Sequence, residues 1–384
     1  MYYLDAAATT PVEESVLDSM IPYFSYKFYN PSANYTPADD ISNTVEKIRR
    51  EIAIYIGCQP SEVYFTSGAS ESNSWAIQGW IKSHPKGRVI TTNIEHDSIL
   101  KMVEDPFLKP YFRVIPVDKY GYVYFEPILK EIEIAIKEGV EREDILVAVQ
   151  YANNEIGTIQ YISLLSDGVK SYGANFFTDA TQYLPEGGYA LCYSFLNNID
   201  MMSMSGHKIG APKGIGLLIV RDRIKISPLI YGTQNFGMRG GTENVPYIVA
   251  LGEAFRLLAG SNRDQISYTR RELLRKFGEI TPIKENGGMN HLGNNINITF
   301  LDEDISGQNM VNILSAIGVY ISMGSACSAH DDEPSHVLKA IGLTDEEISH
   351  TIRITIPHDF KDEDIPNVVA QFQKAIDLIK ESKK

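Results

Sequence analysis

Short apolar runs alternate with amphipathic segments along roughly the first 260 residues of this chain. The apolar runs predict buried strands, which are expected at 63–66, 88–92, 145–149, 176–178 and 216–220. Between them, apolar residues recur at helical spacing over 42–56, 71–83 and 125–138. This alternation predicts an α/β fold whose mainly parallel central sheet is covered by helices on both faces.

The pattern changes after about residue 258, where strands no longer alternate regularly with helices. Helices are predicted at 268–277, 307–318 and 365–382, and strands at 295–300 and 351–355. Such an arrangement is typical of a smaller α+β domain. We therefore expect a large domain over 14–257 and a small domain formed by 1–13 together with 258–384.

Composition allows a large packed core, because 43% of the 384 residues are hydrophobic and 22% are charged. A net charge of −14 argues against nucleic-acid partners and against binding to anionic membranes. Three cysteines do not form a disulfide framework, and no signal peptide or membrane-spanning run is evident. These features predict a soluble, cytoplasmic protein.

Polar residues that can carry chemistry follow the predicted strands. Lys208 lies in Ser205-Gly206-His207-Lys208, a glycine-rich turn before a buried strand. A partly desolvated lysine there can attack a carbonyl and form a Schiff base, although a surface loop is the commoner setting of a lysine. The glycines lack the order of a P-loop, so that nucleotide-binding motif is not indicated.

Two further motifs could bind an anion and a protonated ring, respectively. Gly68-Ala69-Ser70 forms a small-residue turn where a helix begins, so its backbone N–H groups could bind an anion; an ordinary helix cap is the alternative. Asp179 follows a strand and could face a protonated ring nitrogen, or could simply cap a helix.

His96 and Asn154 follow two other predicted strands. His96 could stack on a ring or move protons, but a lone histidine is more often a structural hydrogen-bonding group. Taken together, the lysine, aspartate, histidine, amide and anion site should lie along one sheet edge. A single pyridoxal phosphate cofactor would use this set.

Cys327 lies in the small-residue stretch SMGSACSAHDDEPSH. A buried structural cysteine is the usual default, but this stretch is too polar for a plain core strand. A zinc site from Cys327, His330 and His336 lacks a fourth ligand and a paired Cys-x-x-Cys motif, so no metal site is predicted. An exposed cysteine with polar neighbours can instead provide a nucleophilic thiolate.

These residues, in this order, resemble the NifS-like cysteine desulfurases of the class V aminotransferase group, which have the fold-type-I pyridoxal-phosphate architecture. The resemblance covers nearly the whole chain, from Tyr3-Leu4-Asp5 through Gly237–Asn244 to Arg353. The combination of Ser-Gly-His-Lys with Gly-Ser-Ala-Cys-Ser is highly specific. No Gly-x-Gly-x-x-Gly motif follows the first strand, so a nicotinamide enzyme is disfavoured.

The resemblance implies a role for each matching residue. Lys208 would hold pyridoxal phosphate covalently and move the substrate's α-proton, while Asp179 would pair with the ring nitrogen. His96 would stack on the ring and assist proton transfer. The remaining cofactor contacts would come from Asn154, Gln182, Gly68, Ala69, Ser70, Ser205 and His207.

The resemblance also implies partners. Thr242 would reach the phosphate of a second subunit, so a homodimer is expected. Arg353 would clamp the carboxylate of L-cysteine beside Asn154. Cys327, on a loop of the small domain, would take the substrate sulfur as a persulfide and release alanine.

A sulfur-acceptor protein would follow, either an iron–sulfur scaffold or a tRNA-thiolation protein. The alternatives on the same fold are a selenocysteine lyase, an aminotransferase, or a relative of low activity that needs a partner. An aminotransferase is disfavoured because transamination needs no thiol.

Overall fold

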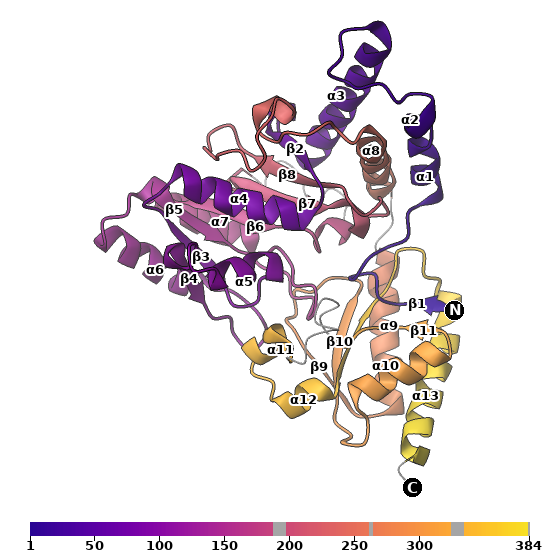
Figure 1. Cartoon of the computed structure of the whole chain (residues 1–384). Coiled ribbons are helices and arrows are strands. Elements are labelled where there is room, and N and C mark those ends of the chain that lie inside the picture. The colour runs from indigo at the N-terminus through magenta and orange to yellow at the C-terminus, as the bar shows by residue number, and fades with distance from the viewer. Residues whose placement is uncertain (187–196, 261–263, 324–333, 383–384) are drawn as a thin grey trace.

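The computed structural model describes residues 1–186, 197–260, 264–323 and 334–382 (Figure 1). Within these ranges the largest sheet has seven strands: β2 (Val63–Thr66), β8 (Gly216–Val220), β7 (Met201–Ser205), β6 (Asn175–Asp179), β5 (Ile145–Ala148), β3 (Arg88–Thr92) and β4 (Phe112–Ile115), in spatial order. Strands β4, β3, β5, β6 and β7 run parallel, while β8 is antiparallel to both of its neighbours. The predicted α/β fold with a mainly parallel sheet is confirmed.

Helices cover both faces of this sheet. One face is covered by α4 (Ala69–Ser83) and α5 (Asp97–Glu104), and the other by α3 (Thr36–Ile56), α6 (Phe125–Lys137), α7 (Ile162–Ser171) and α8 (Val245–Ala259). Successive residues of β5 alternate between these layers: Leu146 packs with Trp75, and Val147 packs with Ile132. Every β5 side chain is therefore buried, as a sheet between two helical layers requires.

A second sheet lies apart from the first, with both chain termini on its side of the molecule (Figure 1). It contains β12 (Thr351–Thr355), β10 (Asn295–Phe300) and β9 (Ile283–Glu285), all antiparallel. The short strands β1 (Tyr2–Tyr3) and β11 (Val319–Tyr320) pair in parallel beside it. The other helices are α1 (Glu14–Met20), α2 (Pro22–Ser25), α9 (Asp264–Ile280), α10 (Gly307–Ala316), α11 (His336–Ala340), α12 (Asp345–Ser349) and α13 (Ile365–Ser382).

The elements predicted from periodicity are present, with shifted boundaries. The helix predicted from residue 42 begins at Thr36, where Pro37 occupies the first turn. Strand β7 was not predicted, because its sequence MMSMS contains only methionine and serine, which have no strong preference for strands. Helix α8 was also not predicted.

The carboxyl ends of β2, β3, β5, β6 and β7 lie along one edge of the large sheet, as their pairing directions require. Ligands bind outside this edge in open α/β sheets. No helix in the described ranges is long and apolar enough to span a membrane.

Candidate active site

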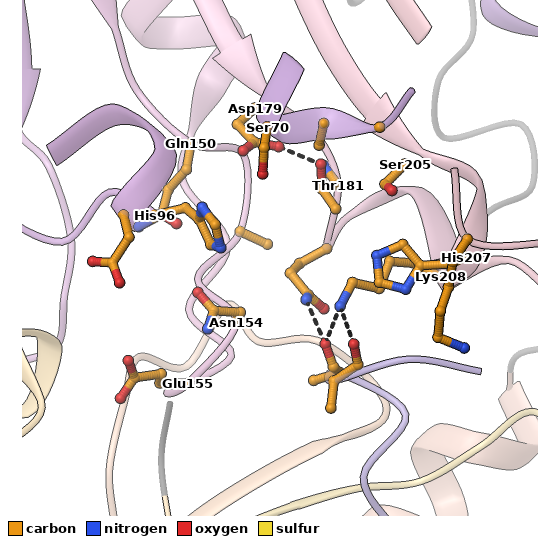
Figure 2. Close-up of a pocket in the computed structure, with 18 of the residues that line it drawn as sticks. Ser70, His96, Gln150, Asn154, Glu155, Asp179, Thr181, Ser205, His207 and Lys208 are labelled. Atoms are coloured by element: carbon orange, nitrogen blue, oxygen red, sulfur yellow. Dashed lines mark hydrogen bonds between the residues drawn. The ribbon is translucent and has the colours of Figure 1, made fainter. Parts of the chain in front are cut away.

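A cavity of about 390 Å³ opens at the carboxyl edge of the large sheet (Figure 2). Its volume is in the range of small-molecule sites. Residues from both halves of the chain line it; among them are Gly68, Ala69, Ser70, His96, Asn154, Asp179, Gln182, Ser205, His207, Lys208 and Arg353. The residues predicted at five strand ends, together with several that only the resemblance implied, such as Arg353, thus line one cavity.

Lys208 ends a short 3-10 turn, Gly206–Lys208, that directly follows β7. Its amine donates hydrogen bonds to the carbonyl oxygens of Ala7 and Ala8, the latter at 2.8 Å. Gln182 Nε2 donates to the same Ala7 oxygen at 3.0 Å. The N-terminal segment therefore holds the amine of Lys208 at the cavity wall.

Asp179 ends β6 and is only 7% exposed. Its Oδ1 accepts the backbone N–H of Thr181 at 2.9 Å, and its Oδ2 accepts Asn73 Nδ2 at 2.7 Å. Asn73 is fully buried in α4, and its Oδ1 accepts the hydroxyl of Ser203. The aspartate is thus held in one orientation by donors from two directions.

Asn73 also connects Asp179 to His96. Its Nδ2 donates to Ser98 Oγ at 2.8 Å, and Ser98 Oγ lies 2.9 Å from His96 Nδ1. The backbone N–H of Ser98 donates to the same Nδ1 at 3.0 Å. Since Nδ1 accepts this N–H, the proton of a neutral His96 ring sits on Nε2.

The turn before α4 can receive an anion. Gly68 is the N-cap, with no side-chain hydrogen bond that caps the helix. The turn lies close to β8, because a Cβ at Gly216 would come within 2.6 Å of the Gly68 Cα atom. Uncapped N–H groups at the start of a fifteen-residue helix favour a phosphate.

His207 also lines the cavity, in an electropositive setting. Burial, followed by the charges of Lys208 and Lys213, lowers the pKa of His207 to about 4. The ring is therefore neutral near pH 7, and its Nδ1 lies 3.1 Å from Thr9 Oγ1. It can contact a phosphate as a hydrogen-bonding group rather than as a cation.

Two buried carboxyl groups, Glu95 and Glu155, lie at this edge of the sheet, and Glu155 lines the cavity. Burial raises the pKa of Glu95 to about 8, although Thr92 and the Gln150 amide donate to it. Burial also raises the pKa of Glu155, which accepts the Ser335 hydroxyl at 2.5 Å. The Glu155 carboxylate meets Ser335, and the backbone carbonyl of Glu95 meets His336, so these two residues connect the sheet edge to the start of α11.

Arg353 lies in the middle of β12 and is completely buried. Its Nη1 donates to the carbonyl oxygen of Asn154 at 3.2 Å, and its Nη2 pairs with Asp5 at 2.7 Å. This arginine lines the cavity from the side of the small sheet. It is thus placed to meet a substrate anion, and it already carries one carboxylate partner.

The remaining predicted residues have different outcomes. Thr242 is not among the described residues that line it, and Cys327 and His330 fall outside the described residues. His336, the third residue of the disfavoured zinc set, lines the cavity, and its Nε2 lies 3.0 Å from the carbonyl oxygen of Glu95.

Several residues that matter at the site were not assigned roles from the sequence. These are Asp5, Asn73, Glu95, Ser98, Glu155 and Thr181. Most act on another side chain rather than on the cavity, and no local pattern marks that role. Asn73 had the clearest signal of these residues, because it lies one helical turn after the predicted anion-binding turn.

The residues fit pyridoxal phosphate on chemical grounds. The cofactor needs an amine for its aldehyde, a carboxylate for its ring nitrogen and a cradle for its phosphate. Lys208, Asp179 and the uncapped start of α4 supply these three groups around one cavity. Since hydrogen bonds within the protein already orient Lys208 and Asp179, the site is largely preorganised.

The chain is similar to known proteins over nearly its whole length. The family model for aminotransferase class V matches residues 2–368. The cysteine desulfurase IscS of Methanosarcina thermophila is 38% identical over 379 residues, covering 96% of this chain and 90% of the relative.

Solved structures are similar in the same way. A structure titled NifS-like protein has a TM-score of 0.85 at 28% identity and covers 98% of this chain and 99% of its own. SspA in complex with cysteine has a TM-score of 0.79 at 35% identity and covers 93% and 99% respectively.

Proposed function

The chain belongs to the class-V aminotransferase family and is a cysteine desulfurase that uses pyridoxal phosphate, and from this premise we propose how its residues divide the work. The observation that carries the proposal is that Lys208, Asp179 and the start of α4 line one cavity. When bound, pyridoxal phosphate supplies an electron-withdrawing ring that stabilises negative charge at the substrate's α-carbon. The protein's residues hold the cofactor, orient the substrate and move its protons.

The site residues act at stated atoms in this proposal. Lys208 Nζ holds the cofactor and then takes the substrate's α-proton. Asp179 would keep the ring nitrogen protonated, and His96 would stack on the ring and assist proton transfer. Asn154 and Gln182 contact the phenolic oxygen, and Arg353 binds the substrate carboxylate, with Asn154 beside it.

The phosphate contacts in the proposal come from small residues and one histidine. Gly68, Ala69 and Ser70 offer backbone N–H groups and a hydroxyl, and Ser205 adds a second hydroxyl. His207 contributes a neutral N–H.

Cys327 carries the sulfur in this proposal. Its thiolate attacks the sulfur of L-cysteine, so an S–S bond forms while the substrate's C–S bond breaks. The electron pair of the broken bond stays with carbon, which takes up a proton to give alanine. The enzyme keeps a persulfide for an acceptor, either an iron–sulfur scaffold or a tRNA-thiolation protein.

The proposal is tested with L-cysteine, a reductant and three proteins: wild type, Lys208→Ala and Cys327→Ala. Wild type should form alanine and sulfide in equal amounts. Cys327→Ala should keep the yellow cofactor but form neither product, and Lys208→Ala should lose covalent attachment of the cofactor. Turnover by Cys327→Ala at the wild-type rate would refute the persulfide step, and exchange of the amino group with a keto acid would indicate an aminotransferase.

We also propose a homodimer. Large apolar side chains are exposed around α2: Phe24 is 60% exposed, Tyr26 80% and Phe28 64%. A patch of this kind is typical of a surface that another chain covers. The Arg239–Glu71 ion pair holds the segment before Thr242 against the start of α4. In the proposed dimer, Thr242 extends from this anchored segment to the cavity of the second subunit.

We propose a division into two domains, 14–257 and 1–13 with 258–384. Separate hydrophobic clusters support it: Leu4 packs with Ile298 and Phe372, whereas Val16 packs with the large-sheet cluster. We further propose that the enzyme works in the cytoplasm, because a persulfide carrier needs a reducing compartment that keeps its thiol free.

A further inference from the structure

A carboxylate of the N-terminal segment meets the arginine of the cavity. Asp5 Oδ1 lies 2.7 Å from Arg353 Nη2, across 348 positions of sequence. The arginine side chain is 1% exposed and that of Asp5 is 18% exposed, so water screens the pair poorly. Among the described residues, this is the one ion pair that Arg353 makes.

The backbone holds Asp5 in this place. Residue 5 forms a parallel bridge with Thr355, two positions after Arg353 on β12. The Thr355 N–H donates to the Leu4 carbonyl at 2.7 Å, and the Ala6 N–H donates to the Thr355 carbonyl at 3.1 Å. Asp5 is therefore positioned by main-chain bonds on both sides, not by a flexible loop.

The guanidinium is oriented from two directions at once. The Asp5 carboxylate accepts a hydrogen bond from Nη2, and the carbonyl oxygen of Asn154 accepts one from Nη1 at 3.2 Å. The Nε atom is buried and has no hydrogen-bond partner among the described residues. The plane of the guanidinium is thus fixed, and donor capacity remains for one more anion.

Other carboxylates near the cavity do not share this role. Glu155 is fully buried near Arg353, but its Oε2 accepts the Ser335 hydroxyl instead. Asp179 is bonded by Asn73 and by the Thr181 amide. Among the carboxylates of the described residues, only Asp5 pairs with the guanidinium.

We propose that Asp5 is a positioning residue for the substrate carboxylate: it fixes the fork of Arg353 so that the free N–H edge meets the carboxylate in a bidentate pair. This inference rests on the proposed role of Arg353. A displaced fork loses the two parallel hydrogen bonds that distinguish arginine from a point charge. Asp5 itself does not touch the substrate.

The test measures calorimetric binding of two probes to the holoenzyme. L-alanine carries a carboxylate, and ethylamine is the same amine without it. Asp5→Asn removes the charge at nearly constant size and should weaken L-alanine binding about tenfold, as expected for one lost charge-assisted contact. Ethylamine binding should stay within twofold of wild type, which a general loss of structure would not allow.

Two further variants make the result interpretable. Asp364→Asn removes another carboxylate that contacts the N-terminal segment, through the Tyr2 hydroxyl at 3.2 Å, and should bind both probes as wild type does. Asp5→Glu keeps the charge but shifts its position, so it should keep part of the L-alanine affinity. It serves as the test variant if Asp5→Asn folds poorly.

Arg353→Gln separates the inference from its premise. If Arg353→Gln weakens L-alanine binding and Asp5→Asn does not, the positioning role of Asp5 is refuted and that of Arg353 stands. If Arg353→Gln leaves L-alanine binding unchanged, the proposed role of Arg353 fails and the inference fails with it. Tighter L-alanine binding by Asp5→Asn would also overturn the inference, because Asp5 would then be a competitor.

Discussion

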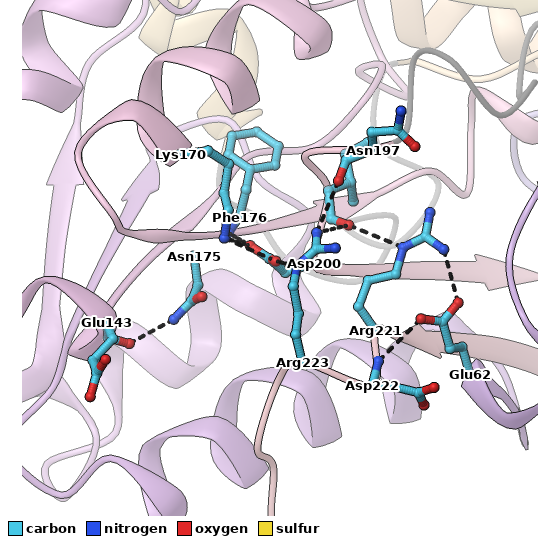
Figure 3. A network of polar contacts seen from close by, with 11 residues as sticks. Glu62, Glu143, Lys170, Asn175, Phe176, Asn197, Asp200, Arg221, Asp222 and Arg223 are labelled. Atoms are coloured by element: carbon cyan, nitrogen blue, oxygen red, sulfur yellow. Dashed lines mark hydrogen bonds and ion pairs between the residues drawn. The ribbon is translucent and has the colours of Figure 1, made fainter.

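The strongest stability prediction concerns Asp200, which precedes β7 at the end opposite the cavity (Figure 3). Its carboxylate is fully buried and accepts the backbone N–H of Phe176 at 2.8 Å. It also pairs with Lys170 at 3.0 Å and with Arg223 at 2.8 Å. Asp200→Asn would leave two cations facing an amide.

The expected cost follows from burial. Removing one partner of a buried ion pair costs about 3–5 kcal/mol, because the remaining charge is left uncompensated. Lys170 and Arg223 are 24% and 46% exposed, so they can partly turn to water, and we expect the lower end, about 3 kcal/mol. Arg223→Ala should cost about 1 kcal/mol or less, since Lys170 still neutralises Asp200.

The assay is urea unfolding of the holoenzyme, followed by circular dichroism at fixed protein and cofactor concentrations. Glu138→Gln is the matched control: Glu138 pairs with Arg88 at 2.7 Å but is 47% exposed. That variant should lose less than about 1 kcal/mol. A loss below about 1 kcal/mol for Asp200→Asn at an unchanged m-value, or equal losses for both variants, would refute the reasoning that burial decides the cost.

Two other predictions follow from buried groups. Burial lowers the pKa of His291 to about 4, so the unfolded state binds an extra proton between pH 4 and 6.5 and stability falls as the pH is lowered through this window. Between pH 7.5 and pH 4, the free energy of unfolding measured in urea should therefore fall by up to about 3 kcal/mol less for His291→Asn than for wild type. Parallel pH profiles for the two proteins would contradict this. Asn73→Ala removes a donor from Asp179 and the link to Ser98, so fluorescence titration should show pyridoxal phosphate binding about tenfold weaker. Unchanged affinity would mean that the Thr181 amide alone orients Asp179.

Local patterns in the sequence were enough to predict the α/β fold and most of the cavity. Buried strands of a parallel sheet are short, continuous apolar runs, so β2, β3, β5 and β8 could be located. Because the carboxyl ends of such strands share an edge, His96, Asn154, Asp179 and Lys208 could be expected together without any structure. The resemblance of their motifs then named the cofactor that they share.

Only the tertiary structure decided how these residues are held. Asn73 meets Asp179 across 106 positions, Ser335 meets Glu155 across 180, and Asp5 meets Arg353 across 348. No periodicity or local motif encodes contacts at such separations, because they form only when elements far apart in the chain pack together. The sequence by itself indicated the main chemical groups of the cavity, whereas the fold determined which neighbour orients each of them.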